Sequence, residues 1–172
     1  MMRGVAGFRF AAVACCFLAL AACSKKNTPD LEANPGTDDG SGGGGSYADG
    51  SKGQFDTEVG NTVYYIVDQS TLTDEGQDTL RKQAAWLERY KNVTVQVEGH
   101  ADERGTREYN IALSARRATA ARNFLIAQGV DAKRIASIAF GKERPAALCD
   151  AEECWSQNRR SVTVITGGAK TS

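Results

Sequence analysis

The sequence predicts an α/β fold, a two-layer sandwich in which helices pack on a mixed four-stranded sheet. Segments typical of strands and helices follow one another in the order βαβαβ, and one more strand comes after them. The clearest strand is 93–98, where apolar and polar residues alternate. The clearest helix is 108–128, because apolar residues recur along one face and Gly129 is placed to end it in the left-handed conformation.

The remaining elements are predicted from local composition. Residues 61–67 are rich in β-branched and aromatic side chains, which favours a strand. A helix capped by Thr71 or Thr73 should follow and run to about Tyr90. The other predicted segments are a polar loop at 99–107, strands at 134–140 and 161–166, and a long excursion at 146–158.

The first 22 residues have the features of a signal peptide. Arg3 and Arg9 supply positive charge, and residues 10–22 form an unbroken apolar run. A run of this length suits the hydrophobic region of a signal peptide and is short for a membrane span, although a short membrane anchor is the alternative. We therefore expect residues 1–22 to be a processing signal and the rest of the chain to be exported.

The apolar run ends at Leu-Ala-Ala-Cys23, which resembles the lipobox of bacterial lipoproteins. The resemblance implies that Cys23 is lipidated and becomes the first residue of the mature protein. Such lipoproteins carry several acyl chains on this cysteine, enough for a stable anchor, whereas one chain would bind only marginally. Ser24 follows, and by the sorting rule of these lipoproteins it favours the outer membrane. The folded domain is expected to face the periplasm.

Residues 23–58 are expected to form the lipidated N-terminus and a flexible linker. Pro29, Pro35 and the glycine-serine run at 40–46 cannot bury a core. A flexible linker of this length has a root-mean-square span of about 30 Å, so it would hold a domain at a variable distance from a membrane. The domains expected after the linker are a folded domain at 59–166 and a tail at 167–172.

The charge of the chain excludes one class of partner. Lys and Arg together number 21, and so do Asp and Glu, which leaves no formal net charge. A near-neutral chain lacks the basic surface that nucleic-acid binding requires. Partners must therefore be recognised by local chemistry rather than by bulk charge.

Two cysteines remain once the signal and Cys23 are set aside. The spacing of Cys149 and Cys154 favours a disulfide in an oxidising periplasm, with two free thiols or a metal pair as alternatives. A metal pair is the weaker alternative, because His100 is the single histidine and no second cysteine pair accompanies it. We expect neither a metal nor another cofactor.

The densest polar segment, 98–110, joins the clearest strand to the clearest helix. Ligands of α/β sheets usually bind beyond the carboxyl end of a strand. Asp102 in this loop and Arg117 in the helix could lie side by side, where the carboxylate would accept from an ammonium group and the guanidinium would fork onto a carboxylate. Such a pair would hold a zwitterion. The alternative is an Asp–Arg salt bridge on a solvated face.

Catalysis is not expected of this segment. His100 beside Asp102 and Glu103 could suggest an acid–base group, but a hydrolase needs a nucleophile paired with a base, or a set of metal ligands. A lone histidine in a loop is more often a packing or hydrogen-bonding residue. Arg116, Arg159 and Arg160 are expected to be solvated surface charges. Trp86 and Trp155 are expected to be structural anchors of the core or of loops.

The segment 95–118 resembles the signature of the OmpA-like peptidoglycan-binding domains. Three shorter motifs are similar to those of a narrower family, the peptidoglycan-associated lipoproteins of the Tol–Pal system: Asp-Glu-Arg-Gly-Thr at 102–106, Gly-Lys-Glu-Arg-Pro at 141–145 and Asn-Arg-Arg-Ser-Val at 158–162. The similarity covers about residues 60–166. It implies an OmpA-like fold and a ligand that is the meso-diaminopimelate side group of the peptidoglycan stem peptide, which is a zwitterion.

The resemblance also assigns residues to this ligand. Asp102 matches the aspartate that binds the ammonium group, and Arg117 matches the arginine that binds the carboxylate. Asn110 and Leu113 match positions that shape the pocket from the start of the helix, and Thr106 lies in the loop that approaches the ligand. If the Asp102–Arg117 pair serves the ligand alone, the fold should survive the loss of either residue.

One wall of the expected pocket departs from the family pattern. Residues 66–68, which include Asp68, correspond to this wall, but relatives have Phe/Gly-rich versions of it. A second departure is Cys-Asp-Ala-Glu-Glu-Cys at 149–154, where many relatives have a Gly-His-Asp-Glu-type stretch. The first departure bears on the apolar contacts of the wall and leaves the charged pair in place.

Partners and a role follow from the same resemblance. The expected partners are peptidoglycan, through its diaminopimelate stem, and the Tol proteins, especially TolB. Lipidated Cys23 would hold the outer membrane while the domain grips the wall, which implies a role in envelope integrity and cell division. The alternatives are an OmpA-like lipoprotein that binds the wall without Tol proteins, and a periplasmic enzyme that processes the wall.

Overall fold

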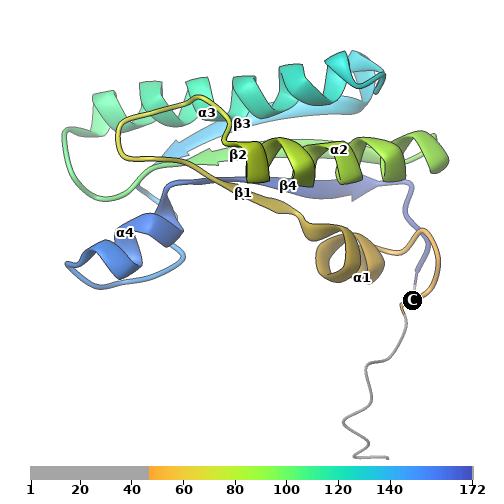
Figure 1. Cartoon of the computed structure of the whole chain (residues 1–172), viewed down its shortest axis with the longest axis horizontal. Coiled ribbons are helices and arrows are strands. Elements are labelled where there is room, and N and C mark those ends of the chain that lie inside the picture. The colour runs from red at the N-terminus through yellow and green to blue at the C-terminus, as the bar shows by residue number, and fades with distance from the viewer. Residues whose placement is uncertain (1–46, 172) are drawn as a thin grey trace, which may run out of the picture. The chain divides into compact units, whose positions relative to one another are not determined.

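A computed structural model describes residues 47–171 (Figure 1). The sheet has the strand order β1-β4-β2-β3. β4 runs antiparallel to both of its neighbours, β1 and β2, while β2 runs parallel to β3. Within the described residues the strands are β1 (Thr62–Tyr64), β2 (Thr94–His100), β3 (Ile135–Gly141) and β4 (Arg160–Gly167). The predicted mixed sheet is therefore confirmed.

Two long helices, α2 (Asp74–Arg89) and α3 (Arg107–Ala127), lie on one face of the sheet (Figure 1). Each begins at a threonine, Thr73 or Thr106, whose hydroxyl accepts a hydrogen bond from a backbone N–H in the first turn. α3 ends before Gly129, whose φ of 106° is left-handed, as predicted. The shorter helical elements of residues 47–171 are α1 (Lys52–Gln54), η1 (Phe55–Gly60), η2 (Ala132–Arg134) and α4 (Glu152–Asn158).

The core lies between the helices and the sheet. Val95 and Val97 belong to β2 and Leu125 to α3, and all three are at most 1% exposed. Gly99 permits the closest approach of the two elements, because a β-carbon there would lie 1.9 Å from the backbone oxygen of Ser114. This close packing fixes the start of α3 over the end of β2, and with it the polar loop that joins them.

The folded part begins before Val59, where the linker was expected to end. Phe55 is fully buried, and its ring centroid lies 4.9 Å from that of Trp86. The indole nitrogen of Trp86 donates to the side-chain oxygen of Gln54 at 2.9 Å. The expectation of linker was wrong for this stretch, because Phe55 is buried against Trp86 and Gln54 accepts a hydrogen bond from Trp86, contacts that the local composition does not indicate. Trp86 is a core anchor, as expected.

The first strand is shorter than predicted. β1 ends at Tyr64, although Ile66 and Val67 have strand-forming side chains. The carbonyl of Ile66 accepts from the Arg117 guanidinium at 3.3 Å and from the backbone N–H of Gln69 at 3.1 Å, rather than from a neighbouring strand. The chain therefore leaves the sheet early and forms a loop toward α2.

α4 lies inside the predicted excursion at 146–158, where no helix was expected from the sequence. Its seven residues give too few apolar positions to show a helical period. Asn158 at its end closes the excursion, because its side-chain oxygen accepts from the backbone N–H groups of Ala146 and Ala147 at 2.7 and 3.1 Å. A disulfide joins Cys149 to Cys154 across the start of the helix.

Several predictions fall outside the described residues. These are the signal peptide at 1–22, the lipidation of Cys23 and the first part of the linker. Within residues 47–171, no helix is both long enough and apolar enough to cross a membrane. The processing signal and the lipid attachment therefore stay predictions.

Candidate functional site

A cavity of about 660 Å³ opens at the end of the sheet where β2 leads into α3. Three segments form it: the loop after β1, the β2–α3 loop at 101–106, and the first turns of α3. The lining residues are Val67, Asp68, Asp102, Arg104, Gly105, Thr106, Tyr109, Asn110, Leu113 and Arg117. All six residues that the sequence assigned to a ligand are among them.

Asp102 lies in the loop wall of this cavity and is only 8% exposed. Its Oδ2 accepts from Arg104 Nη2 at 2.6 Å and from Arg159 Nη1 at 3.3 Å, and its Oδ1 accepts from the backbone N–H of Arg104 at 3.3 Å. Burial by itself would raise the pKa of Asp102, but the hydrogen bonds and positive charges of the two arginines outweigh burial and lower that pKa. The carboxylate is therefore ionised at neutral pH.

Arg117 forms the opposite wall and is completely buried. Its guanidinium donates to three backbone carbonyls, those of Gln69 at 2.8 Å, His100 at 2.9 Å and Ile66 at 3.3 Å. Burial lowers the pKa of Arg117 to about 10, so the side chain stays charged at neutral pH. The guanidinium thus ties the loop after β1 to the end of β2.

The two charged residues face the same cavity without forming a salt bridge. Within residues 47–171, the cationic partners of Asp102 are Arg104 and Arg159, and Arg117 has no carboxylate partner. The alternative prediction, that Asp102 and Arg117 form a salt bridge on a solvated face, is therefore wrong. The cavity is lined by an anion and a cation that do not form an ion pair with each other.

The other predicted ligand residues shape the cavity. The Thr106 hydroxyl caps α3, and the Asn110 side chain donates to the carbonyl of Arg104 at 2.8 Å, which holds the β2–α3 loop. Tyr109 donates a hydrogen bond from its hydroxyl to Asp68, across the mouth. Leu113 supplies a buried apolar surface.

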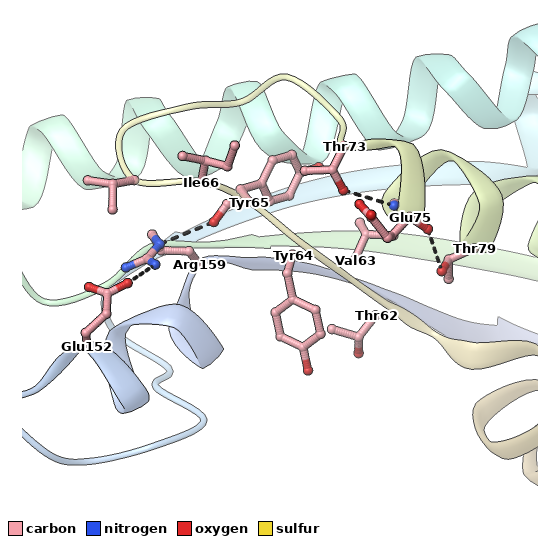
Figure 2. A pocket seen from close by; sticks show the side chains of 12 residues that line it. Thr62, Val63, Tyr64, Tyr65, Ile66, Thr73, Glu75, Thr79, Glu152 and Arg159 are labelled. Atoms are coloured by element: carbon pink, nitrogen blue, oxygen red, sulfur yellow. Dashed lines mark hydrogen bonds and ion pairs between the residues drawn. The ribbon is translucent and has the colours of Figure 1, made fainter.

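Arg159 is not a solvated charge, as the sequence suggested, and that expectation was wrong. It is 5% exposed and donates to the Tyr65 carbonyl at 3.2 Å, to Asp102 and to Glu152. Figure 2 shows it between Glu152 and Tyr65, at the edge of a second cavity of about 470 Å³ that runs along β1. Arg159 therefore supports Asp102 from behind the ligand cavity.

His100 takes no part in an acid–base group. Its ring is 2% exposed and lies 5.5 Å from the ring of Phe140, and neither ring nitrogen has a hydrogen-bond partner among the described residues. Burial, helped by the charges of Arg160 and Arg144, lowers the pKa of His100 to about 4. The residue is a neutral packing group, as expected for a lone histidine.

Sequence reasoning missed three residues that build this site. Arg104 and Tyr109 border the cavity directly, and Arg159 holds Asp102. Arg104 lies inside the motif at 102–106, so its position was visible, but its partner was not. Arg159 is 57 residues away from Asp102, and no local pattern reports a contact of that range.

The described residues show little that would hold a metal. Residues 47–171 contain no group of three or more His, Cys, Asp or Glu side chains placed to bind an ion. Both remaining cysteines lie in the disulfide. The cavity offers carboxylates, guanidinium groups, hydroxyls and an apolar wall, which suits recognition of a small charged group.

Comparison with known sequences points to one family. The sequence profile of the OmpA family matches residues 64–159. The peptidoglycan-associated lipoprotein of Agrobacterium fabrum is 52% identical over 87% of this chain and 83% of the relative. The protein of the same name from Brucella melitensis is 48% identical over 89% of each chain. That from Haemophilus influenzae is 40% identical over 84% of this chain and 88% of the relative.

Solved structures agree with this assignment. The crystal structure of the peptidoglycan-associated lipoprotein from Burkholderia pseudomallei has a TM-score of 0.60 at 37% identity, and the match covers 62% of this chain and 90% of that chain. The C-terminal domain of Helicobacter pylori MotB has a TM-score of 0.57 at 20% identity, covering 61% of this chain and 82% of that chain, which shows the fold alone. The expected OmpA-like fold is confirmed.

Proposed function

The chain belongs to the OmpA family and, within it, to the peptidoglycan-associated lipoproteins, and we propose that it binds the meso-diaminopimelate stem of peptidoglycan and ties the outer membrane to the wall. The family is non-catalytic and associated with the outer membrane, so the expectation that the chain is not an enzyme is confirmed. The ligand, the anchor and the Tol partners are the proposed parts.

One observation carries the ligand proposal. Asp102 and Arg117 present opposite charges to one cavity and are not paired with each other. The side group of diaminopimelate bears an ammonium and a carboxylate on the same carbon. Asp102 can accept from the ammonium, and the remaining N–H groups of Arg117 can donate to the carboxylate. Leu113 would then contact the aliphatic part of the diaminopimelate side chain, and Thr106 would contact the polar backbone of the ligand.

The position of the first residues of the domain supports a role as a tether. Asp49 pairs with Arg89 at 3.2 Å, and Gln54 bonds Trp86, so the first described residues pack against the end of α2. The cavity lies at the start of α3, at the other end of the sheet (Figure 1). α3 has 21 residues, and a helix of that length spans about 30 Å. The chain therefore enters the described domain at the end opposite the cavity.

We propose that this attachment is lipidated Cys23, reached after removal of the signal at 1–22. Cys23→Ser should release the protein from membranes or leave it unprocessed. Membrane fractionation with mass spectrometry of the N-terminus checks this. A Cys23→Ser protein that is still acylated in the outer-membrane fraction would refute the anchor.

We propose the Tol proteins as partners because the motifs at 102–106, 141–145 and 158–162 resemble those of the Tol–Pal lipoproteins. Binding of TolB would place the chain in the Tol–Pal system, with a role in envelope integrity and cell division. A pull-down with purified TolB separates this system from an OmpA-like lipoprotein that binds the wall alone. Retention of TolB supports the assignment, and its absence limits the function to the wall.

Titration of the soluble protein with a diaminopimelate-containing stem peptide tests the central proposal. We expect saturable binding of that peptide and poor binding of the same peptide with lysine, because lysine lacks the side-chain carboxylate. Chromatography of muropeptides incubated with the protein should show no new product. A cleaved muropeptide would favour the wall-processing enzyme, and equal binding of both peptides would contradict recognition of a zwitterion.

A further inference from the structure

The carboxylate of Asp102 is engaged by side chains of the protein itself. Arg104 contacts both of its oxygens, Oδ2 through Nη2 at 2.6 Å and Oδ1 through Nε at 3.3 Å. Arg159 contacts Oδ2 at 3.3 Å. A ligand ammonium must therefore take the place of one of these cations.

The two arginines differ in whether they can yield. The Arg159 side chain is 6% exposed, is held by the Tyr65 carbonyl and Glu152 as well, and does not line the ligand cavity. The Arg104 side chain is 40% exposed and lines the cavity beside Asp102. Arg104 is thus the exchangeable cation, and Arg159 is the fixed one.

Arg104 also has a surface on which to move. Its guanidinium carbon lies 4.2 Å from the centre of the Trp155 ring, and that ring is held by a hydrogen bond from its indole nitrogen to Glu103. A guanidinium stacked on an aromatic face keeps a cation–π contact while it slides. Arg104 can therefore leave Asp102 and keep its contact with Trp155.

We infer that Arg104 makes the Asp102 subsite selective for zwitterions over simple cations. The inference rests on the proposed function. When the ligand ammonium replaces Arg104 on Asp102, the ligand carboxylate on the same carbon, which Arg117 binds from the opposite wall, also comes within reach of the displaced guanidinium. Arg104 then exchanges one carboxylate partner for another. A bare ammonium, such as a lysine side chain, removes the partner of Arg104 and offers none in return.

Removal of the Arg104 side chain should leave the loop in place. Asn110 bonds the backbone carbonyl of Arg104, not its side chain, and Thr106 caps α3 independently. Arg107→Ala serves as a matched control. Arg107 is three residues further on, carries the same charge and pairs with Glu143 at 3.1 Å, but it does not line the cavity.

The test compares two synthetic stem peptides, one with diaminopimelate and one with lysine, by calorimetric titration of the unchanged protein, Arg104→Ala and Arg107→Ala. Thermal unfolding first verifies that each variant is folded. For Arg104→Ala we expect the ratio of the two affinities to fall by roughly two- to fivefold, as estimated for a partly exposed ion pair, mainly because the lysine peptide binds better. Arg107→Ala should keep the ratio of the unchanged protein.

Each other outcome overturns the inference. An unchanged ratio in Arg104→Ala, whether both affinities stay or fall together, would mean that Arg104 only supports the loop, and the proposed function would stand. An equal drop in the ratio for Arg107→Ala would make the effect one of general charge. If the unchanged protein bound neither peptide, the proposed function would fail and the inference with it.

Discussion

The two ends of the sheet are built from different interactions. At the tether end, which we define as residues 47–55 with Trp86 and Tyr90, aromatic rings pack in tilted pairs at centroid distances of 4.9 and 4.7 Å. At the cavity end, which we define as the loops 66–69 and 101–106 with the first turns of α3, buried contacts join charges to carboxylates and carbonyls. Asp102 and Arg117 there are 8% and 0% exposed.

This difference separates stability from recognition. Burial of aromatic surface stabilises a fold directly, whereas a buried charge must recover a desolvation cost through hydrogen bonds. A charged cluster is therefore a poor means of stabilising the domain and a good means of binding a charged ligand. Changes at the tether end should alter stability alone, and changes at the cavity end should alter binding and, where carbonyls depend on them, stability as well.

Phe55→Ala should have the largest effect on stability. Truncation of a fully buried aromatic side chain typically lowers the free energy of unfolding by about 3–5 kcal/mol. Affinity for the diaminopimelate peptide should not change in the folded variant, because the ligand cavity is at the other end of the sheet. Urea unfolding and titration below the melting temperature measure both. A tenfold loss of affinity would show that the two ends are coupled.

Arg117→Ala should affect both properties. The carbonyls of Gln69, His100 and Ile66 lose their donor, which should lower the free energy of unfolding by about 2–4 kcal/mol. Peptide binding should weaken by roughly 30-fold or more. Because Arg117 is completely buried, we expect the fold to survive its loss only with this decrease in stability. Arg117→Lys keeps the charge but not the planar fork, so a full recovery of binding in that variant would contradict the geometry.

His100 should make stability depend on pH. Its folded pKa is about 4, below the ordinary 6.5, so the unfolded chain binds the proton first as pH falls. Above pH 6.5 the histidine is neutral in both the folded and the unfolded chain, and its full contribution to stability is present. As pH falls toward 4, this contribution is lost, and the free energy of unfolding decreases by roughly 3 kcal/mol. His100→Phe, which keeps a ring against Phe140, should flatten this part of the pH profile. An equally steep profile in His100→Phe would assign the pH dependence to other groups.

Reduction of the disulfide should have the smallest effect of the four. Cys149 and Cys154 close a short loop, so the chain-entropy model gives about 2 kcal/mol of stabilisation. The domain should stay folded with a lower melting temperature, and the peptide should still bind. Mass spectrometry of protein isolated from the periplasm tests the bond itself, and two free thiols would refute it.

Local patterns predicted most of the elements but few of the long-range contacts. Alternation in 93–98 and periodicity in 108–128 report which face of each element is buried, and both elements lie within two residues of their predicted ends. The position of β4 between β1 and β2 leaves no local signal. Phe55 shows the same limit, because its partner Trp86 lies on a helix that composition does not connect to it.

The candidate site was predictable as a set of residues but not as a network. Charge chemistry and family resemblance together placed Asp102 and Arg117 at one ligand, and both border one cavity. What holds each of them was not visible. Arg159 reaches Asp102 only because α4 and β4 return the chain to the end of β2, and Arg117 finds carbonyls 48 and 51 residues away.

NMR mapping of the surface that binds the diaminopimelate stem peptide tests the account most directly. Titration into isotopically labelled protein should shift the backbone amides of 66–69, 102–106 and the first turns of α3, at the cavity end. The amides of 47–55 and of Trp86, at the tether end, should stay unchanged, and the lysine peptide should produce much smaller shifts. Shifts that centred on the tether end, or that left Asp102 and Arg117 unaffected at saturation, would contradict the proposed site.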